Sequence, residues 1–248
     1  MDKLWPQQHP TAVESELEEF YAYPAELDRP WVRVNFVSSL DGAVTLHGTS
    51  RGLSSPEDQK VLALIRDLSD VVLVGAGTAL AEGYHGVKRT EVRANRRQRL
   101  GLAEVPPIAV VTAKASIPAD SPLLTDTVVP PIVLTCAAAA PERVDALREA
   151  GADVVVAGEE QVDLRAGLAA LHERGLRRIG CEGGPKLFGS LIEEDLVDEL
   201  CLTLSPLLTN GDASRIASGS GAELQLRMQL RAALHADSML LLRYERQR

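Results

Sequence analysis

The chain has 248 residues, of which 26 are Lys or Arg and 35 are Asp or Glu, so its formal net charge is −9. Its hydrophobic content of 45% is typical of a globular protein and excludes a disordered or fibrous chain. An acidic chain is a poor partner for nucleic acids and anionic membranes, because both require clustered positive charge. A chain of this length can form one α/β domain with a large core.

The N-terminus does not resemble a secretion signal, because polar residues follow Pro6 where an apolar segment would be needed. The longest apolar stretches, such as 132–140, are shorter than the roughly 18 to 20 residues that cross a bilayer. We therefore predict a cytoplasmic protein.

Cysteine and histidine spacing indicates neither disulfides nor a metal site. The three cysteines are odd in number and lack a C-x-x-C motif, which predicts buried, reduced thiols. The five histidines have no metal-ligand spacing, so we assign no metal. These residues are Cys136, Cys181 and Cys201, and His9, His47, His85, His172 and His235.

Residues 1–30 differ from the rest and are predicted to form an N-terminal extension over a single domain at 31–248. The extension contains an acidic helical turn at 14–20, which Pro24 follows. A β-rich strand is expected at 31–37. A helix should then begin at Pro56 with Ser55 as its cap.

Strands and helices alternate over the central part of the chain, which is typical of a parallel sheet. The tail differs, because its three strand-like segments leave no room for long helices between them. The fold class is therefore α/β, with a mainly parallel central sheet, antiparallel C-terminal strands and flanking helices. Strands are expected at 70–74, 108–112, 132–136, 153–157, 177–181, 198–205, 224–230 and 238–244, and helices at 141–150, 163–174 and 185–194.

Two glycine-containing corners follow buried strands. Gly183 and Gly184 lie between a strand and a helix, where free N–H groups attract phosphate, although a plain tight turn is the alternative. Glu182 at the strand end favours a functional site. Gly75 and Gly77 form a second corner that matches only half of a G-x-G-x-x-G fingerprint.

A third candidate segment follows the first strand. Asp41 is a proton donor, a substrate anchor or part of an Asp-Gly turn, and local chemistry favours the turn. Asn35 shares a strand face with Arg33 and Val37, and a polar side chain there needs a partner, either a ligand or the backbone.

In chain order, the segments 34–42, 64–78 and 182–206 resemble the riboflavin-pathway pyrimidine reductase family. In many bacteria this reductase is fused behind a zinc deaminase, whose H-x-E and P-C-x-x-C motifs are absent here. The resemblance covers about residues 31–244 and includes the S-L-D-G, V-G-x-G-T and E-G-G-P-x-L motifs. We therefore expect a stand-alone reductase.

The resemblance implies a dihydrofolate-reductase-like fold, a homodimer, and NADPH-dependent reduction of the ribosyl group of 5-amino-6-ribosylaminouracil 5′-phosphate to ribityl. It places the substrate near Ser50, Arg66, Arg89 and Glu182, and a guanidinium can grip phosphate bidentately. Lys114 is our candidate for the 2′-phosphate of NADPH. With the glycine corners, the remaining cofactor candidates are Ser38, Gly75, Gly77, Thr78, Glu82, Gly183, Gly184, Pro185, Lys186, Leu187, Phe188, Gly189 and Ser190.

The chain departs from the family in two places. Asn35 replaces a lysine that fused enzymes carry, and residues 82–87 replace the usual D-N-P-x-L-T stretch. We predict that Asp41 or Glu182 anchors the pyrimidine, with Asn35 as the third catalytic candidate. The alternatives are reduction of dihydrofolate or another pterin, which the changed loop leaves open, and a non-catalytic nucleotide-binding protein.

One basic stretch interrupts the acidic chain between residues 88 and 99. No aromatic residues interleave with it, so we expect a solvated loop or helix rather than an RNA site. Its cations are Lys88, Arg89, Arg93, Arg96, Arg97 and Arg99.

Overall fold

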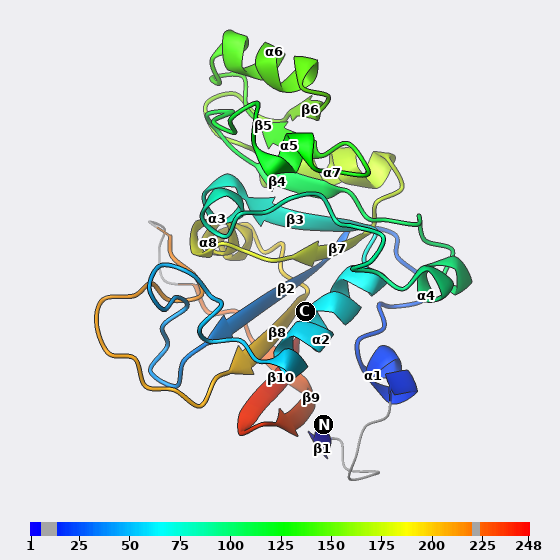
Figure 1. The fold of residues 1–248 in the computed structure, drawn as a ribbon, viewed down its shortest axis with the longest axis vertical. Coiled ribbons are helices and arrows are strands. Elements are labelled where there is room, and N and C mark those ends of the chain that lie inside the picture. The colour runs from blue at the N-terminus through cyan, green and yellow to red at the C-terminus, as the bar shows by residue number, and fades with distance from the viewer. Residues whose placement is uncertain (6–13, 220–223) are drawn as a thin grey trace.

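A single sheet runs through the protein, with helices on both faces (Figure 1). The computed structural model describes residues 1–5, 14–219 and 224–248. In these residues the strand order is β1-β9-β10-β8-β2-β7-β3-β4-β5-β6. The strands are β1 (Asp2–Trp5), β2 (Trp31–Ser38), β3 (Val71–Gly75), β4 (Ile108–Val111), β5 (Ile132–Thr135), β6 (Asp153–Val156), β7 (Arg178–Cys181), β8 (Glu199–Leu204), β9 (Met228–Ala236) and β10 (Met239–Arg246).

The sheet is parallel from β8 to β6 and antiparallel at the other end. There β10 pairs antiparallel with β8 and β9, and β1 pairs antiparallel with β9. The predicted fold class, a mainly parallel sheet that finishes with antiparallel strands, is confirmed. The strand β1 was not expected, because a four-residue segment at a terminus carries no clear pattern. Residues 6–13 of the predicted extension lie outside the described part of the chain.

The helices at 14–20, 56–68, 141–149, 164–173 and 185–193 begin within one residue of their predicted starts, whereas those at 76–81 and 122–125 were not predicted. Ser55 accepts a hydrogen bond from the Asp58 N–H at the start of α2, and Asp163 accepts one from the Ala166 N–H at the start of α7. The helices are α1 (Glu14–Phe20), α2 (Pro56–Leu68), α3 (Ala76–Ala81), α4 (Ala94–Arg99), α5 (Pro122–Thr125), α6 (Pro141–Glu149), α7 (Leu164–Glu173) and α8 (Pro185–Glu193).

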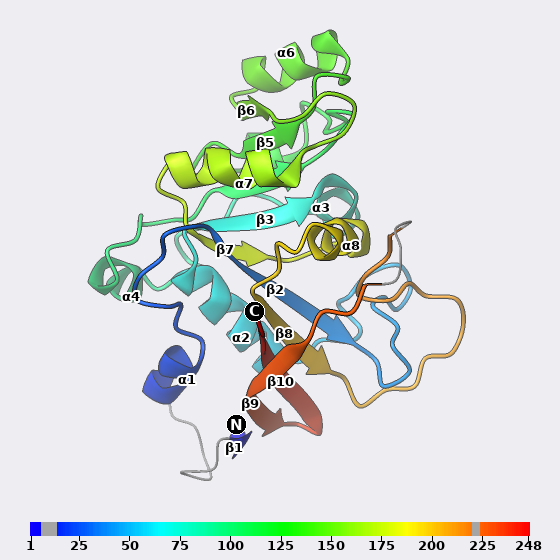
Figure 2. The same cartoon turned by 180° about the vertical axis from the view of Figure 1, so that it is seen from behind.

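The central strands are apolar because both faces of the sheet are covered. Val71 and Leu73 pack in the cluster of α7 and α8, which face the viewer in Figure 2. Val72 and Val74 point the other way, into the cluster that contains residues of α3, α5 and α6. A third cluster packs α2 and Tyr21 against β8, β9 and β10. The continuous apolar runs of the sequence are thus explained by two-sided burial.

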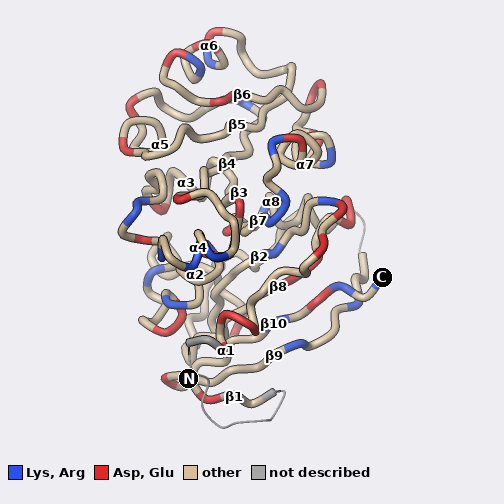
Figure 3. Tube along the Cα trace, turned by 90° about the vertical axis from the view of Figure 1, so that its right-hand side faces the viewer, with Lys and Arg blue, Asp and Glu red and all other residues tan. Residues whose placement is uncertain are grey.

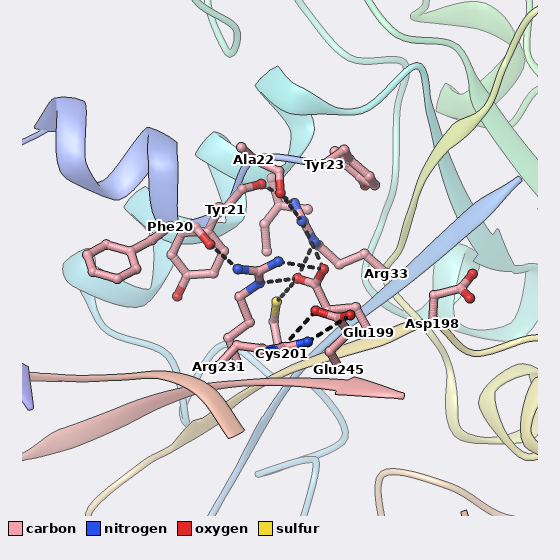
Figure 4. A network of polar contacts seen from close by, with 12 residues as sticks. Phe20, Tyr21, Ala22, Tyr23, Arg33, Asp198, Glu199, Cys201, Arg231 and Glu245 are labelled. Atoms are coloured by element: carbon pink, nitrogen blue, oxygen red, sulfur yellow. Dashed lines mark hydrogen bonds and ion pairs between the residues drawn. The ribbon is translucent and has the colours of Figure 1, made fainter. Parts of the chain in front are cut away.

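A buried ion-pair network joins the N-terminal segment to the sheet (Figure 4). Glu199 on β8 receives Arg33 at 2.6 Å (Nε to Oε1) and Arg243 at 2.8 Å (Nε to Oε1). The two guanidinium groups also donate to the carbonyl oxygens of Phe20 and Tyr21, at 2.6 Å each. The carboxylate and Arg33 are fully buried. The cations therefore hold the end of α1 against the sheet.

The basic stretch is less solvated than predicted. Arg97 in α4 is fully buried and donates to the carbonyl oxygens of Asp67 and Ser69 at the end of α2. Arg96 is also buried and forms ion pairs with Asp67 and Glu18. The prediction of a solvated loop or helix is wrong for these two residues, because Arg97 bonds to backbone carbonyls and Arg96 to the carboxylates of Asp67 and Glu18. Figure 3 shows the positive and negative residues interspersed along the trace.

The three cysteines are free thiols and all are buried, as the sequence predicts. None of the helices in the described residues is long and apolar enough to span a bilayer.

Candidate active site

A cavity of about 270 Å³ lies at the carboxyl ends of β2, β3 and β7, where open α/β sheets bind ligands. One wall comes from β2, a second from the two glycine corners, and a third from α2 and the loop after β2. The loops after β2 and β8 extend beyond the sheet at this end (Figure 1) and touch each other, since the Leu40 N–H donates to the Leu207 carbonyl. The lining residues include Asn35, Phe36, Val37, Ser50, Ser54, Asp58, Gly77, Thr78, Glu82, Tyr84, Glu182, Gly184 and Pro185.

The two glycine corners pack against each other. The Gly75 N–H donates to the Gly183 carbonyl at 2.7 Å. Gly183 has φ +86°, a left-handed conformation that glycine adopts without strain. A Cβ atom on Gly184 would collide with the Thr78 hydroxyl. Gly183 therefore favours glycine because of its φ, and Gly184 because the Thr78 side chain fills the place that a Cβ atom would take.

The glycine corner at Gly184 presents the N-terminus of α8 to the cavity. Gly184 is the N-cap residue and no side chain caps the helix. The next residue, Pro185, also lines the cavity. An uncapped helix N-terminus with a close glycine backbone suits a phosphate group, so the residues present fit a nucleotide cofactor.

Glu182 is held by two neighbours at the cavity wall. Its carboxylate accepts from Arg66 at 2.7 Å (Nε to Oε1) and 2.8 Å (Nη2 to Oε2), and from the Tyr84 hydroxyl at 2.5 Å. Burial and the Glu182 charge raise the pKa of Tyr84 well above its ordinary value, so the phenol stays protonated. The predicted substrate arginine thus pairs with the predicted substrate anchor.

Tyr84 was not singled out by the sequence, although it lies in the changed stretch 82–87. The Arg66 guanidinium lies 5.8 Å from the centre of its ring. In the sequence, Tyr84 could have been noticed only as an aromatic residue within a stretch expected to shape the pocket. That stretch therefore contributes a hydroxyl donor to the glutamate at the cavity wall.

Asp58 is a second residue that sequence reasoning missed. It lies in the first turn of α2, where a carboxylate is expected for helix capping alone. The structure instead places it in the cavity wall, 6% exposed, with the Ser54 hydroxyl at 2.6 Å from Oδ2. No sequence pattern indicates this position, because the burial of the carboxylate depends on how the amphipathic helix α2 packs in the fold.

Asn35, Ser50 and Glu82, three of the residues singled out from the sequence, line the same cavity. The Ser50 N–H donates to Glu82 Oε1 at 2.7 Å, which fixes the loop after β2 to the end of α3. The Asn35 side chain forms no hydrogen bond with any described residue. Its amide is therefore available to a ligand.

Asp41 does not line the cavity. Its carboxylate accepts from the Ser39 hydroxyl and from the backbone N–H groups of Thr209 (3.0 Å) and Asn210 (2.7 Å). These bonds lower the pKa of Asp41 to about 2, with the Ser39 hydroxyl as the largest cause. In this structure Asp41 fastens the turn after β2 to the loop after β8.

Other predicted residues lie apart from the cavity lining. Arg89 is exposed and pairs with Glu104 at 2.7 Å. Lys114 is exposed beyond the end of β4. Ser38 is buried within β2.

The first turns of α8 carry the remaining cofactor candidates. Leu187 and Phe188 belong to the hydrophobic core, where the Phe188 ring stacks on Phe36 with centroids 5.4 Å apart. Gly189 lies close to the Ser218 backbone. Lys186 is exposed and Ser190 is half-buried.

The fold and the cavity define an α/β protein with a phosphate-compatible corner beside a polar pocket. The chain belongs to the family of the RibD C-terminal domain, which matches residues 30–242. This confirms the resemblance to the riboflavin-pathway pyrimidine reductases.

Named relatives support the same family. A 2,5-diamino-6-ribosylamino-4(3H)-pyrimidinone 5′-phosphate reductase of Archaeoglobus fulgidus is 34% identical over 81% of this chain and 92% of its own. The reductase of that name from Methanothermobacter thermautotrophicus is 31% identical over 87% and 98%. The crystal structure of a pyrimidine reductase-like protein from Corynebacterium diphtheriae has a TM-score of 0.80 and 26% identity, covering 93% of this chain and 99% of the other.

Proposed function

We propose that this protein is an NADPH-dependent reductase of riboflavin biosynthesis, which converts the ribosyl group of a ribosylaminopyrimidine 5′-phosphate to ribityl. The observation that carries the proposal is the cavity, where an uncapped helix N-terminus and close-packed glycines adjoin a wall of polar side chains. The named relatives that match most of their length support the same reaction.

The cofactor would lie against the glycine corners. Gly75, Gly77 and Thr78 would face it from one side, and 183–190 from the other, with the start of α8 near a phosphate. When bound, NADPH supplies a hydride to C1′ of the ribosyl group. Lys114 is exposed and free of ion pairs with described residues, so it can meet the 2′-phosphate that distinguishes NADPH from NADH.

The substrate would occupy the polar side of the cavity. Asn35 can donate a hydrogen bond to it but cannot donate a proton, so the proton would come from another group. Glu182 keeps Arg66 and Tyr84 in place beside the reacting group. Ser50 lines the same space. Arg89 remains our candidate for the substrate phosphate because the carboxylate that pairs with it among the described residues, Glu104, is itself exposed.

The family resemblance supports three further parts of the proposal. The protein would be a homodimer, which light scattering on the purified chain tests. Residues 31–248 would form one reductase domain, with 1–30 as an extension. A biosynthetic enzyme that uses NADPH would act in the cytoplasm.

The deciding experiment is NADPH oxidation at 340 nm by the purified protein. The diaminopyrimidinone and uracil forms of the ribosylamino phosphate, and dihydrofolate, are supplied in parallel. Turnover of a ribosylamino compound supports the proposal. Turnover of dihydrofolate alone would indicate a pocket changed for pterins, and NADPH binding with no turnover of any compound would contradict the proposed reaction.

The roles of the two predicted anchors are tested with Asp41→Asn and Glu182→Gln. We expect loss of turnover for Glu182→Gln, whose carboxylate is in the cavity wall. Unchanged turnover for Asp41→Asn would restrict Asp41 to fastening the loops.

A further inference from the structure

Asp41 joins the two loops that extend beyond the sheet at the cavity end (Figure 1). Its Oδ2 atom accepts the successive N–H groups of Thr209 (3.0 Å) and Asn210 (2.7 Å). Its Oδ1 atom accepts the hydroxyl groups of Ser39 and Thr209. Successive backbone N–H groups that point to one side form a concave site for an anion. The loop after β8 thus binds this carboxylate much as it would bind a free anion.

These contacts go beyond the roles that the sequence left open for Asp41. The carboxylate does not line the cavity, so it is not placed to anchor a substrate. Its hydrogen bonds, with the Ser39 hydroxyl as the largest cause, lower its pKa to about 2, so it stays ionised at neutral pH and cannot donate a proton. A simple Asp-Gly turn would account for the bond with Ser39 but not for those with Thr209 and Asn210.

The loop after β8 contacts two walls of the cavity. Residues 205–219 of this loop contain no helix or strand, so their conformation depends on a few contacts. The Ser214 carbonyl accepts the Val44 N–H at 3.2 Å, and both residues line the cavity. The Ser218 N–H donates to the carbonyl of Pro185, at 3.0 Å, in the first turn of α8. The segment therefore connects the loop after β2 with the helix N-terminus proposed for the cofactor.

The side chain of Asp41 can be changed without touching the cavity lining. Leu40, Val44 and Pro185 contact the loop after β8 through backbone hydrogen bonds, which a substitution leaves in place. Asp41 does so through its carboxylate, which is exposed and outside the cavity wall. A substitution here therefore loosens the loop and alters no residue that would meet substrate or cofactor.

We propose that Asp41 is a positioning residue, which holds the loop after β8 in place and so couples cofactor binding at α8 to substrate binding beside the loop after β2. The inference rests on the proposed function and adds a link between its two ligands. A cofactor phosphate that fixes the start of α8 also fixes Ser218, and the held loop keeps Val44 in place. The second ligand then loses less conformational entropy, so each ligand raises the affinity for the other by the same factor.

The first test measures this factor in wild type and in Asp41→Ala. The diaminopyrimidinone ribosylamino phosphate is titrated calorimetrically with and without NADP⁺, which has no hydride to transfer. We expect NADP⁺ to tighten its binding to wild type by about 5-fold or more, the usual range for coupled sites, and the factor should approach 1 in Asp41→Ala. With NADPH, the KM of the variant should rise by a similar factor, whereas kcat should change less, because saturating ligands hold both loops.

Hydrogen exchange measured by mass spectrometry gives a second readout that needs no substrate. In wild type, NADP⁺ should slow exchange in both 39–54 and 205–219. In Asp41→Ala, 205–219 should exchange faster, and NADP⁺ should no longer protect 39–54. Asp41→Asn keeps one acceptor oxygen and should lie between the two.

Asp153→Ala is the matched control. It removes an exposed carboxylate that also accepts hydrogen bonds, here from Arg174, at the amino end of β6 and outside the cavity lining. It should keep the wild-type coupling factor, KM and exchange.

Two results would overturn the proposal. One is a wild type whose affinity for the pyrimidine phosphate is the same with and without NADP⁺. The other is an Asp41→Ala variant that loses kcat but keeps the wild-type coupling factor and exchange, because Asp41 would then act on the substrate directly. If Asp41→Ala unfolds, Asp41→Asn decides, since it preserves the shape of the side chain, and an unchanged coupling factor would overturn the proposal.

Failure of the proposed function would be separately visible. If wild type oxidises NADPH with none of the supplied compounds, the proposed reaction is wrong. The effect of NADP⁺ on exchange in 39–54, compared between wild type and Asp41→Ala, still decides whether Asp41 couples the two loops.

Discussion

Two buried glutamates in this protein bind arginine in the same bidentate way and serve different regions. Glu199 lies beside the N-terminal segment (Figure 4), accepts from both Arg33 and Arg243, and has no exposed surface. Glu182 lies at the cavity wall, where Arg66 and the neutral Tyr84 hold it. The Glu199 carboxylate is fully enclosed by protein, whereas Glu182 borders space for a ligand.

The cost of losing an ion pair depends on whether protein or solvent surrounds it. Breaking a buried pair leaves an uncompensated charge, which costs more than an exposed pair contributes. We expect Glu199 to matter mainly for folding. Glu182 should matter mainly for activity, because water and Glu91, 3.6 Å from Arg66, can partly compensate its loss.

The largest effect is expected for Glu199→Gln. This change leaves Arg33 and Arg243 without an anion in the interior, so the free energy of unfolding should fall by about 3–5 kcal/mol. Urea denaturation measures it. Glu245→Gln, which breaks an exposed pair with Arg231, is the control and should cost less than about 1 kcal/mol; equal losses would contradict the assignment.

Acid should weaken the same network. Burial alone would raise the pKa of Glu199, but Arg33 and Arg243 lower it from 4.5 to about 2. A lowered pKa in the folded state gives stability that is present above about pH 4.5 and is lost as the pH falls toward 2. Urea midpoints measured from pH 6 to pH 3 should fall more steeply for wild type than for Glu199→Gln. Parallel curves would show that other groups cause the acid sensitivity.

Glu182→Gln should affect activity more than stability, in contrast to Glu199→Gln. We expect the free energy of unfolding to fall by about 1.5–3 kcal/mol, the range for hydrogen bonds to a charged group. Turnover should fall at least about tenfold, since glutamine keeps only one acceptor oxygen and no charge, so it cannot hold both Arg66 and Tyr84 as the carboxylate does. A stability loss as large as that of Glu199→Gln, with full activity in the folded protein, would contradict the different roles assigned to the two glutamates.

The smallest effect is expected for Tyr84→Phe. Removing one hydroxyl donor from Glu182 should lower the free energy of unfolding by about 0.5–1.5 kcal/mol. Thermal and urea unfolding measure the change, with Tyr244→Phe as control, because the Tyr244 hydroxyl has no bond to any described residue. If the control loses as much stability, the Tyr84 hydroxyl is not a specific part of the site.

Much of the fold could be predicted, because it depends on local rules. The continuous apolar runs of β3, β4 and β5 became strands buried on both faces, and Ser55 and Asp163 capped the helices assigned to them. The strand β1 could not be predicted, since it forms only through pairing with β9, more than 200 residues away in the chain.

The glycines of the candidate site could be singled out from the sequence, because a tight turn is a local requirement. A residue that reaches the site only through the packing of distant elements was missed. Gly183 and Gly184 could be singled out from sequence because the chain must turn there. Asp58 looked like an ordinary helix-start residue, and only the packing of α2 beside β2 places its carboxylate in the cavity wall. Arg97 looked like a solvated cation for the same reason, since its carbonyl acceptors come from other segments.

The pairing of β1 with β9 also shortens the unpaired edge that this end of the sheet offers to other molecules. A nine-residue strand at the end of a sheet would offer a long row of unpaired N–H and C=O groups to another chain. The four residues of β1 cover part of that row and leave only a short strand at the margin. Through β1, the start of the chain thus leaves less of this sheet edge open to pairing with another molecule.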